Sequence, residues 1–169
     1  VAVRLVILDL DGTLWETDAR VCSNLAPPLE RDGPDALRDA AGRRLWLLPR
    51  TRETLLLLRE RGVHLSAASM NEEGIAREAL ALLGLDGIFS YAQMRPYTKD
   101  VSVHTILRLF RDRAGLDLAP GEVLFVDNSR AQVEAARGLG VRAVQFGTEI
   151  ATLADLLDRL DGDGGGRAR

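Results

Sequence analysis

The sequence of 169 residues predicts an α/β fold, in which helices cover both faces of a mainly parallel sheet in three layers. Short apolar runs rich in β-branched residues, typical of strands buried on both faces, alternate with stretches in which leucine and alanine recur at helical spacing. Hydrophobic residues make up 46% and charged residues 28% of the chain, which is the balance of a globular protein with one core. We therefore expect a single domain over residues 1–160.

The first expected strand covers residues 3–8 and ends at the run Asp9-Leu10-Asp11-Gly12, where glycine permits a sharp turn. Residues 15–48 then form an insert without a regular helical or strand pattern. Its three prolines indicate a loop, and residues 36–47 indicate a hairpin. We expect this insert to be a small flap and not a domain of its own.

From Arg50 onward, helices and strands alternate, and glycines 62, 84 and 140 are expected to end helices. The expected helices cover residues 51–61, 71–83, 101–114, 130–139 and 152–160. The expected strands cover residues 63–68, 88–91, 122–126 and 141–145. Residues 161–169 are rich in glycine and charge, so we expect a disordered tail.

Charge and cysteine content exclude several classes of function. The formal net charge of −3 argues against a protein whose main partner is nucleic acid. The single cysteine, Cys22, allows no internal disulfide and fits a reducing compartment. The apolar run at residues 3–8 is too short to span a membrane. We expect a cytoplasmic protein that binds neither nucleic acid nor membranes.

Polar side chains follow three expected strands where each strand ends, and parallel strands bring these ends to one rim of the sheet. Asp9 and Asp11 are two residues apart, so in extended chain both point to the same side. With a third aspartate they make a set of negative oxygen ligands suited to Mg²⁺. The rim residues are Asp9 and Asp11 after the first strand, Ser69 after residues 63–68, and Asp127 and Asn128 after residues 122–126.

An anion can bind at the same rim. Lys99 precedes an expected helix and can reach it, and the Ser69 hydroxyl adds a donor. Backbone N–H groups at Leu10 and Met70, in the turns that follow Asp9 and Ser69, supply further donors. One carboxylate can then attack phosphorus while another protonates the leaving oxygen.

The run Asp9-Leu10-Asp11-Gly12-Thr13 matches the DxDGT signature of the haloacid dehalogenase (HAD) superfamily, and Ser69, Lys99 and Asp127 follow in the family's order. Within that superfamily the chain most resembles the magnesium-dependent phosphatases, over residues 3–146. The features that carry this resemblance are Thr13-Leu14-Trp15, Pro27-Pro28 and the hairpin before Leu48-Pro49. The resemblance implies a Rossmann-like sheet with a small flap in place of a cap domain.

The resemblance also implies a role for each matching residue. Asp9 would be the nucleophile that forms a phosphoaspartate, and Asp11 the general acid and then the base. Ser69 and Lys99 would hold phosphate, and Mg²⁺ would bind Asp9, Asp127 and the backbone carbonyl of Asp11. The expected activity is hydrolysis of phosphomonoesters on small molecules, such as sugar phosphates, or on protein side chains, such as phosphotyrosine.

The chain departs from the family pattern at two places. Asn128 stands where many relatives carry a second acid; asparagine can orient a metal-bound water but adds no charge. Met70 and Asn71 follow Ser69, whereas relatives often have an arginine there, and this difference bears on substrate preference.

Three alternative functions stay open. The first is a receiver-type phosphoacceptor domain, although in those the phosphorylated aspartate lies on a middle strand and here the motif is on the first. The second is a transferase that passes the group to an acceptor other than water. The third is a chain that only binds a partner, which the complete set of motif residues argues against. The substrate and the oligomeric state also stay open.

Overall fold

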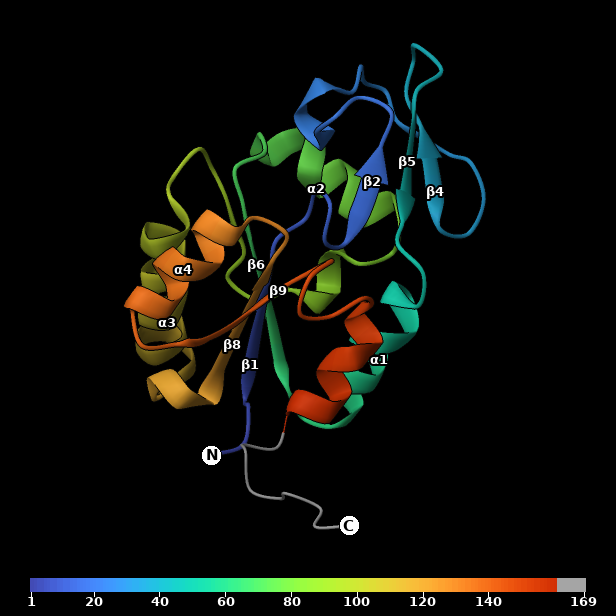
Figure 1. Ribbon diagram of the computed structural model, residues 1–169. Coiled ribbons are helices and arrows are strands. Elements are labelled where there is room, and N and C mark those ends of the chain that lie inside the picture. The colour runs from blue at the N-terminus through green and yellow to red at the C-terminus, as the bar shows by residue number, and fades with distance from the viewer. Residues whose placement is uncertain (161–169) are drawn as a thin grey trace, which may run out of the picture.

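Five strands form the central sheet of the computed structural model, which describes residues 1–160 (Figure 1). The order across the sheet is β7-β6-β1-β8-β9, and each neighbouring pair is parallel. The predicted α/β class with a mainly parallel sheet is therefore confirmed. The expected tail at residues 161–169 lies outside the described residues. The strands are β1 (Leu5–Leu8), β6 (His64–Ser69), β7 (Gln93–Met94), β8 (Val123–Asp127) and β9 (Arg142–Gln145).

Alternate residues of β1 enter two separate hydrophobic clusters, one on each face of the sheet. Val6 and Leu8 belong to the cluster that contains α1 and α2, whereas Leu5 and Ile7 belong to the cluster that contains α3 and α4. Figure 1 shows α3 and α4 together on one side of the sheet and α1 on the other. The α-helices are α1 (Thr51–Glu60), α2 (Glu73–Leu82), α3 (Lys99–Ala114) and α4 (Arg130–Gly138).

The insert after β1 is more regular than the sequence predicts. It forms a second, antiparallel sheet in the order β2-β5-β4-β3, which includes the expected hairpin, here β4 and β5. The expectation of an irregular insert outside that hairpin was wrong, because strands of two to four residues are too short to produce a recognisable alternation. The strands are β2 (Trp15–Thr17), β3 (Glu30–Arg31), β4 (Ala36–Arg38) and β5 (Arg44–Leu47).

We call residues 15–48 the flap. Its apolar side chains, including Trp15 and Leu45, are buried in the same cluster as α1 and α2. A short 3₁₀ helix in the flap, η1 (Cys22–Asn24), packs against α2. The flap is thus anchored to the main core rather than to a core of its own.

Asp39 holds the hairpin turn together. Its carboxylate accepts hydrogen bonds from the backbone N–H groups of Ala26, Ala41 and Arg43 and pairs with the Arg43 guanidinium at 2.9 Å. Burial alone would raise the pKa of Asp39, but the hydrogen bonds from Ala26 and Arg43 outweigh it and lower the pKa to about 2.

Several expected boundaries shift in the structure. The strand expected at residues 88–91 was wrong: a 3₁₀ turn, η2 (Asp86–Ile88), comes first, and β7 follows at the sheet edge. The last expected helix is a 3₁₀ helix, η4 (Leu153–Arg159). Lys99 is the first residue of α3 and not part of the preceding loop. Along residues 1–160, every helix is too short or too polar to cross a membrane.

Candidate active site

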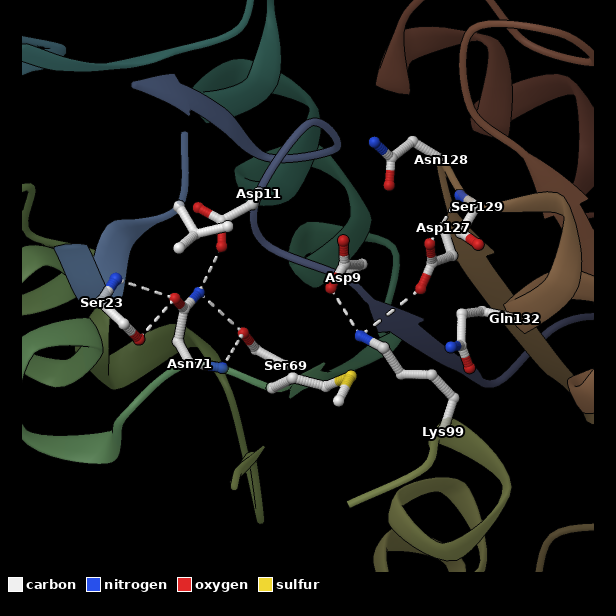
Figure 2. Close-up of a pocket in the computed structure, with 12 residues that line it drawn as sticks. Asp9, Asp11, Ser23, Ser69, Asn71, Lys99, Asp127, Asn128, Ser129 and Gln132 are labelled. Carbon is white, nitrogen blue, oxygen red and sulfur yellow. Dashed lines mark hydrogen bonds and ion pairs between the residues drawn. The ribbon is translucent and has the colours of Figure 1, made fainter. Parts of the chain in front are cut away.

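A cavity of about 410 Å³ lies at the carboxyl ends of β1, β6 and β8 (Figure 2). Seven of the eight predicted site residues line this cavity, including Met70 and Asn128. Leu10 is the exception: its side chain is fully buried in the core, so only its backbone N–H can face a ligand. The other five predicted residues that line the cavity are Asp9, Asp11, Ser69, Lys99 and Asp127.

The Lys99 ammonium lies between two carboxylates at the floor of the cavity. Its Nζ is 2.5 Å from Asp9 Oδ1 and 3.4 Å from Asp127 Oδ2, and it also donates to the backbone carbonyl of Ala68. All three charged side chains are buried. The positive charge of Lys99 therefore compensates two negative charges that would otherwise repel each other inside the protein.

The pKa of Asp9 reflects this crowding. Burial raises it above its usual value, Lys99 opposes that rise, and the neighbouring Asp127 adds to it. A further positive charge in the cavity would favour the ionised form of Asp9.

Asp127 has an oxygen that fits a cation. Its Oδ1 accepts a hydrogen bond from the backbone N–H of Ser129, whereas the buried Oδ2 has only the 3.4 Å ion pair with Lys99 and no hydrogen-bond partner within residues 1–160. Buried anionic oxygens without donors are costly, and a hard divalent cation such as Mg²⁺ offsets that cost. The oxygens of Asp9 and Asp127 therefore fit the magnesium that the resemblance implies.

The Asp11 carboxylate turns toward the flap and away from Asp127 (Figure 2). Its Oδ1 accepts from the Trp15 indole N–H at 2.8 Å and from the Cys22 backbone N–H at 3.0 Å, and its Oδ2 accepts from Asn71 Nδ2 at 2.6 Å. In the described part of the chain, no three His, Cys, Asp or Glu side chains lie close enough together to hold a metal. The Asp11 side chain is thus not grouped with those of Asp9 and Asp127.

Asn128 lies beside the turn that follows Asp11. Gly12 in that turn has a φ of +72°, and a Cβ built on it would lie only 2.3 Å from Asn128 Nδ2. Glycine is therefore needed both for the left-handed conformation and for the close approach of Asn128.

Several residues of the site were not predicted. Asn71 contacts Asp11 and Ser69, although the sequence suggested for it only an effect on specificity. Trp15 is fully buried and donates to Asp11. The only available signal was the position of Asn71 two residues after Ser69; nothing in the insert marks its contact residues. The remaining unpredicted residues that line the cavity are Val21, Ser23, Ser129 and Gln132.

Comparison with known structures supports the fold. A HAD-superfamily hydrolase from Geobacter sulfurreducens superposes with a TM-score of 0.68 at 18% identity, covering 94% of this chain and 97% of the other. A HAD phosphatase from Thermococcus onnurineus gives a TM-score of 0.64 at 20% identity, covering 94% and 98%. A search of curated proteins finds no match.

The sequence of the chain matches a family model described as acid phosphatase over residues 2–155. This span includes the whole cavity and almost all of the described chain. Together with the motif order and the parallel sheet, this family match confirms the predicted superfamily. The protein is therefore a phosphatase of the HAD superfamily and belongs to the acid phosphatase family.

Proposed function

We propose that this phosphatase hydrolyses phosphomonoesters in two steps, with Asp9 as the nucleophile and Asp11 as the general acid and base. The observation that carries the proposal is that both carboxylates line one cavity while only Asp9 is paired with a buried cation, Lys99. A carboxylate next to a fixed positive charge is favoured as an anion, as a nucleophile requires.

In the first step, Asp9 Oδ2, the oxygen not paired with Lys99, attacks phosphorus. The bond between phosphorus and the ester oxygen breaks, and Asp11 gives its proton to the departing alcohol. In the second step, Asp11 removes a proton from water, which attacks phosphorus of the phosphoaspartate. Inorganic phosphate leaves, and the Asp9 carboxylate and the protonated Asp11 are restored.

Lys99 and Ser69 are the groups we assign to the phosphoryl oxygens. The Lys99 ammonium lies at the attacking carboxylate, and Ser69 ends the neighbouring strand. Asp9, Asp127 and the backbone carbonyl of Asp11 would hold Mg²⁺, with Asn128 acting through water. When bound, Mg²⁺ supplies positive charge that stabilises the transferred phosphoryl group.

We also propose that the substrate is a small phosphate ester or a phosphorylated protein side chain.

The single thiol, Cys22, is buried, and burial raises its pKa to about 12, which makes it a poor nucleophile. A reduced cysteine fits our assignment of the enzyme to the cytoplasm.

The test is release of phosphate from p-nitrophenyl phosphate with and without Mg²⁺, by the parent chain and by Asp9→Asn. We expect magnesium-dependent turnover that falls by ~10⁴-fold or more in the variant, as when other enzymes lose their nucleophile. Asp86→Asn makes the same chemical change at an exposed site and should leave turnover unchanged. Turnover that survives in Asp9→Asn would contradict the mechanism.

Two further measurements separate the alternatives. If the parent does not release phosphate, a long-lived phosphoaspartate after treatment with acetyl phosphate would favour the receiver-type function. If turnover is seen, transfer of phosphate to added alcohols or sugars in preference to water would favour the transferase.

A further inference from the structure

Asn71 forms hydrogen bonds with three different parts of the site. Its Nδ2 donates to Asp11 Oδ2 at 2.6 Å and to Ser69 Oγ at 2.9 Å. Its Oδ1 accepts from the backbone N–H and from the hydroxyl of Ser23 in the flap, at 2.9 and 2.8 Å. The side chain is 4% exposed, so these bonds are formed away from bulk water. Both donors and both lone pairs of the amide are used, which fixes its orientation.

The contact with Ser69 decides where the serine hydroxyl points. Ser69 Oγ accepts from the backbone N–H of Asn71 at 3.1 Å as well as from Nδ2. A hydroxyl has two lone pairs and one hydrogen, so two accepted bonds leave the hydrogen directed away from Asn71. Ser69 is then left to donate, which is what an anion in the cavity requires.

Within residues 1–160 the Asp11 carboxylate accepts three hydrogen bonds, and the one from Asn71 comes from the sheet side of the cavity. The other two donors, Trp15 and Cys22, belong to the flap. Because Oδ1 takes both flap donors and Oδ2 takes only Asn71, a lone pair on Oδ2 is left for a proton. The amide thereby sets the direction in which that proton lies.

We propose that Asn71 is a positioning residue that orients the Asp11 carboxyl group toward the leaving oxygen. Its hydrogen bonds with Ser23 make this orientation depend on the position of the flap. This inference rests on the proposed role of Asp11 as general acid. A residue that acts through a general acid affects esters according to how much their leaving groups need a proton. A residue that only supports the fold affects all esters alike.

The experiment compares kcat/KM for glycerol phosphate, whose alkoxide must be protonated, with that for p-nitrophenyl phosphate, whose phenolate leaves without a proton. In Asn71→Asp, which keeps the shape but replaces the donor with an oxygen, we expect loss of ~10²-fold for the alkyl ester and ~10-fold or less for the aryl ester, since general acids contribute on the order of 10²–10⁴-fold. Asn71→Ala should give the same selective loss.

Ser23→Ala leaves the backbone N–H of residue 23 to donate to Asn71 Oδ1 but removes the hydroxyl contact, and with it the acceptor of the Glu72 backbone N–H. It should show the same selectivity with a smaller loss. Asn24→Ala is the matched control: this exposed neighbour donates only to the Ala19 carbonyl within the flap, and both esters should react as in the parent. Thermal unfolding of each variant identifies any that misfolds. If both Asn71 variants misfold, the selectivity of Ser23→Ala between the two esters tests the proposal.

Equal losses for the two esters, or none in either, would overturn the inference while leaving the proposed function intact. A parent that releases phosphate from neither ester would overturn the proposed function and the inference with it.

Discussion

Asp9 and Asp11 lie two residues apart in the chain and line the same cavity, yet they are held by opposite kinds of contact. Asp9 follows a strand of the parallel sheet and pairs with the buried ammonium of Lys99 at 2.5 Å. Asp11 lies under the flap and accepts three hydrogen bonds, all from neutral N–H groups. Figure 2 shows the pair of Asp9 with Lys99 and the bond of Asp11 with Asn71 on different sides of the cavity.

The difference indicates why one carboxylate suits attack and the other suits proton transfer. The ammonium of Lys99 opposes the rise in the pKa of Asp9 that burial causes, and so favours the anion that a nucleophile needs. The flap side offers Asp11 only neutral N–H donors, which orient its carboxyl group without adding a charge.

The largest effect is expected from removal of the cation on the sheet side. Lys99→Met keeps the length of the side chain but leaves Asp9 and Asp127 buried without their shared positive charge. We expect kcat/KM to fall by ~10²–10³-fold, as on loss of other preorganised donors. The free energy of unfolding in urea should fall by ~3–5 kcal/mol, because an uncompensated buried charge remains.

The effect of Mg²⁺ on the Tm of Lys99→Met tests where the metal binds. If Asp9 and Asp127 hold the cation, Mg²⁺ should raise the Tm of Lys99→Met more than that of the parent, since the metal replaces the missing charge. An equal rise in Tm for both proteins would argue that Mg²⁺ binds elsewhere.

The second largest effect is expected at the turn that follows Asp11. In Gly12→Ala the new Cβ would meet Asn128 at 2.3 Å on a residue with φ +72°. We expect a loss of ~1–2 kcal/mol in stability from the left-handed conformation, and a fall in kcat/KM of ~10²-fold from displacement of reacting groups.

Gly42→Ala provides the matched control. Gly42 has φ +84° in the flap hairpin, and nothing lies within 4 Å of its built Cβ. Urea unfolding should show a similar loss of stability in both variants, and phosphate release should fall only in Gly12→Ala. A comparable loss of activity in Gly42→Ala would mean that backbone strain in general, and not the contact of residue 12 with Asn128, limits turnover.

Three residues on the sheet side of the site could be predicted from sequence because each follows an apolar run. Asp9, Ser69 and Asp127 come at the ends of β1, β6 and β8, and parallel pairing brings those ends together. Element type was likewise predictable wherever the apolar pattern was long. The two-residue strand β7 was misplaced because the apolar residue that suggested it, Ile88, is buried in the core as part of a 3₁₀ turn.

The flap side could not be predicted in the same way. Asp11 lines the same cavity as Asp9, but the contacts of its carboxylate with Trp15 and Cys22 were not predicted. The bond between Asn71 and Ser23 joins residues 48 apart and depends on how the flap packs on α2. Such contacts leave no periodicity in the sequence, so only tertiary structure reveals them.

The smallest effect on activity, and the most specific to the flap, is expected at Asp39. In Asp39→Asn the amide nitrogen would face two donors that now meet Oδ2, the Ala26 N–H and the Arg43 guanidinium. Thermal unfolding should show a lower Tm, with a modest fall in turnover because the sheet side stays intact.

The pH dependence of stability provides the check. The folded pKa of about 2 lies below the ordinary value of 3.8, so the contribution of Asp39 is complete above pH 4 and is lost as the pH falls toward 2. Between these values the parent should lose more stability than Asp39→Asn, which has no group to protonate at this position. Parallel curves for the two proteins over that range would show that the hairpin does not depend on the charge of Asp39, and that the flap is held by its buried leucines alone.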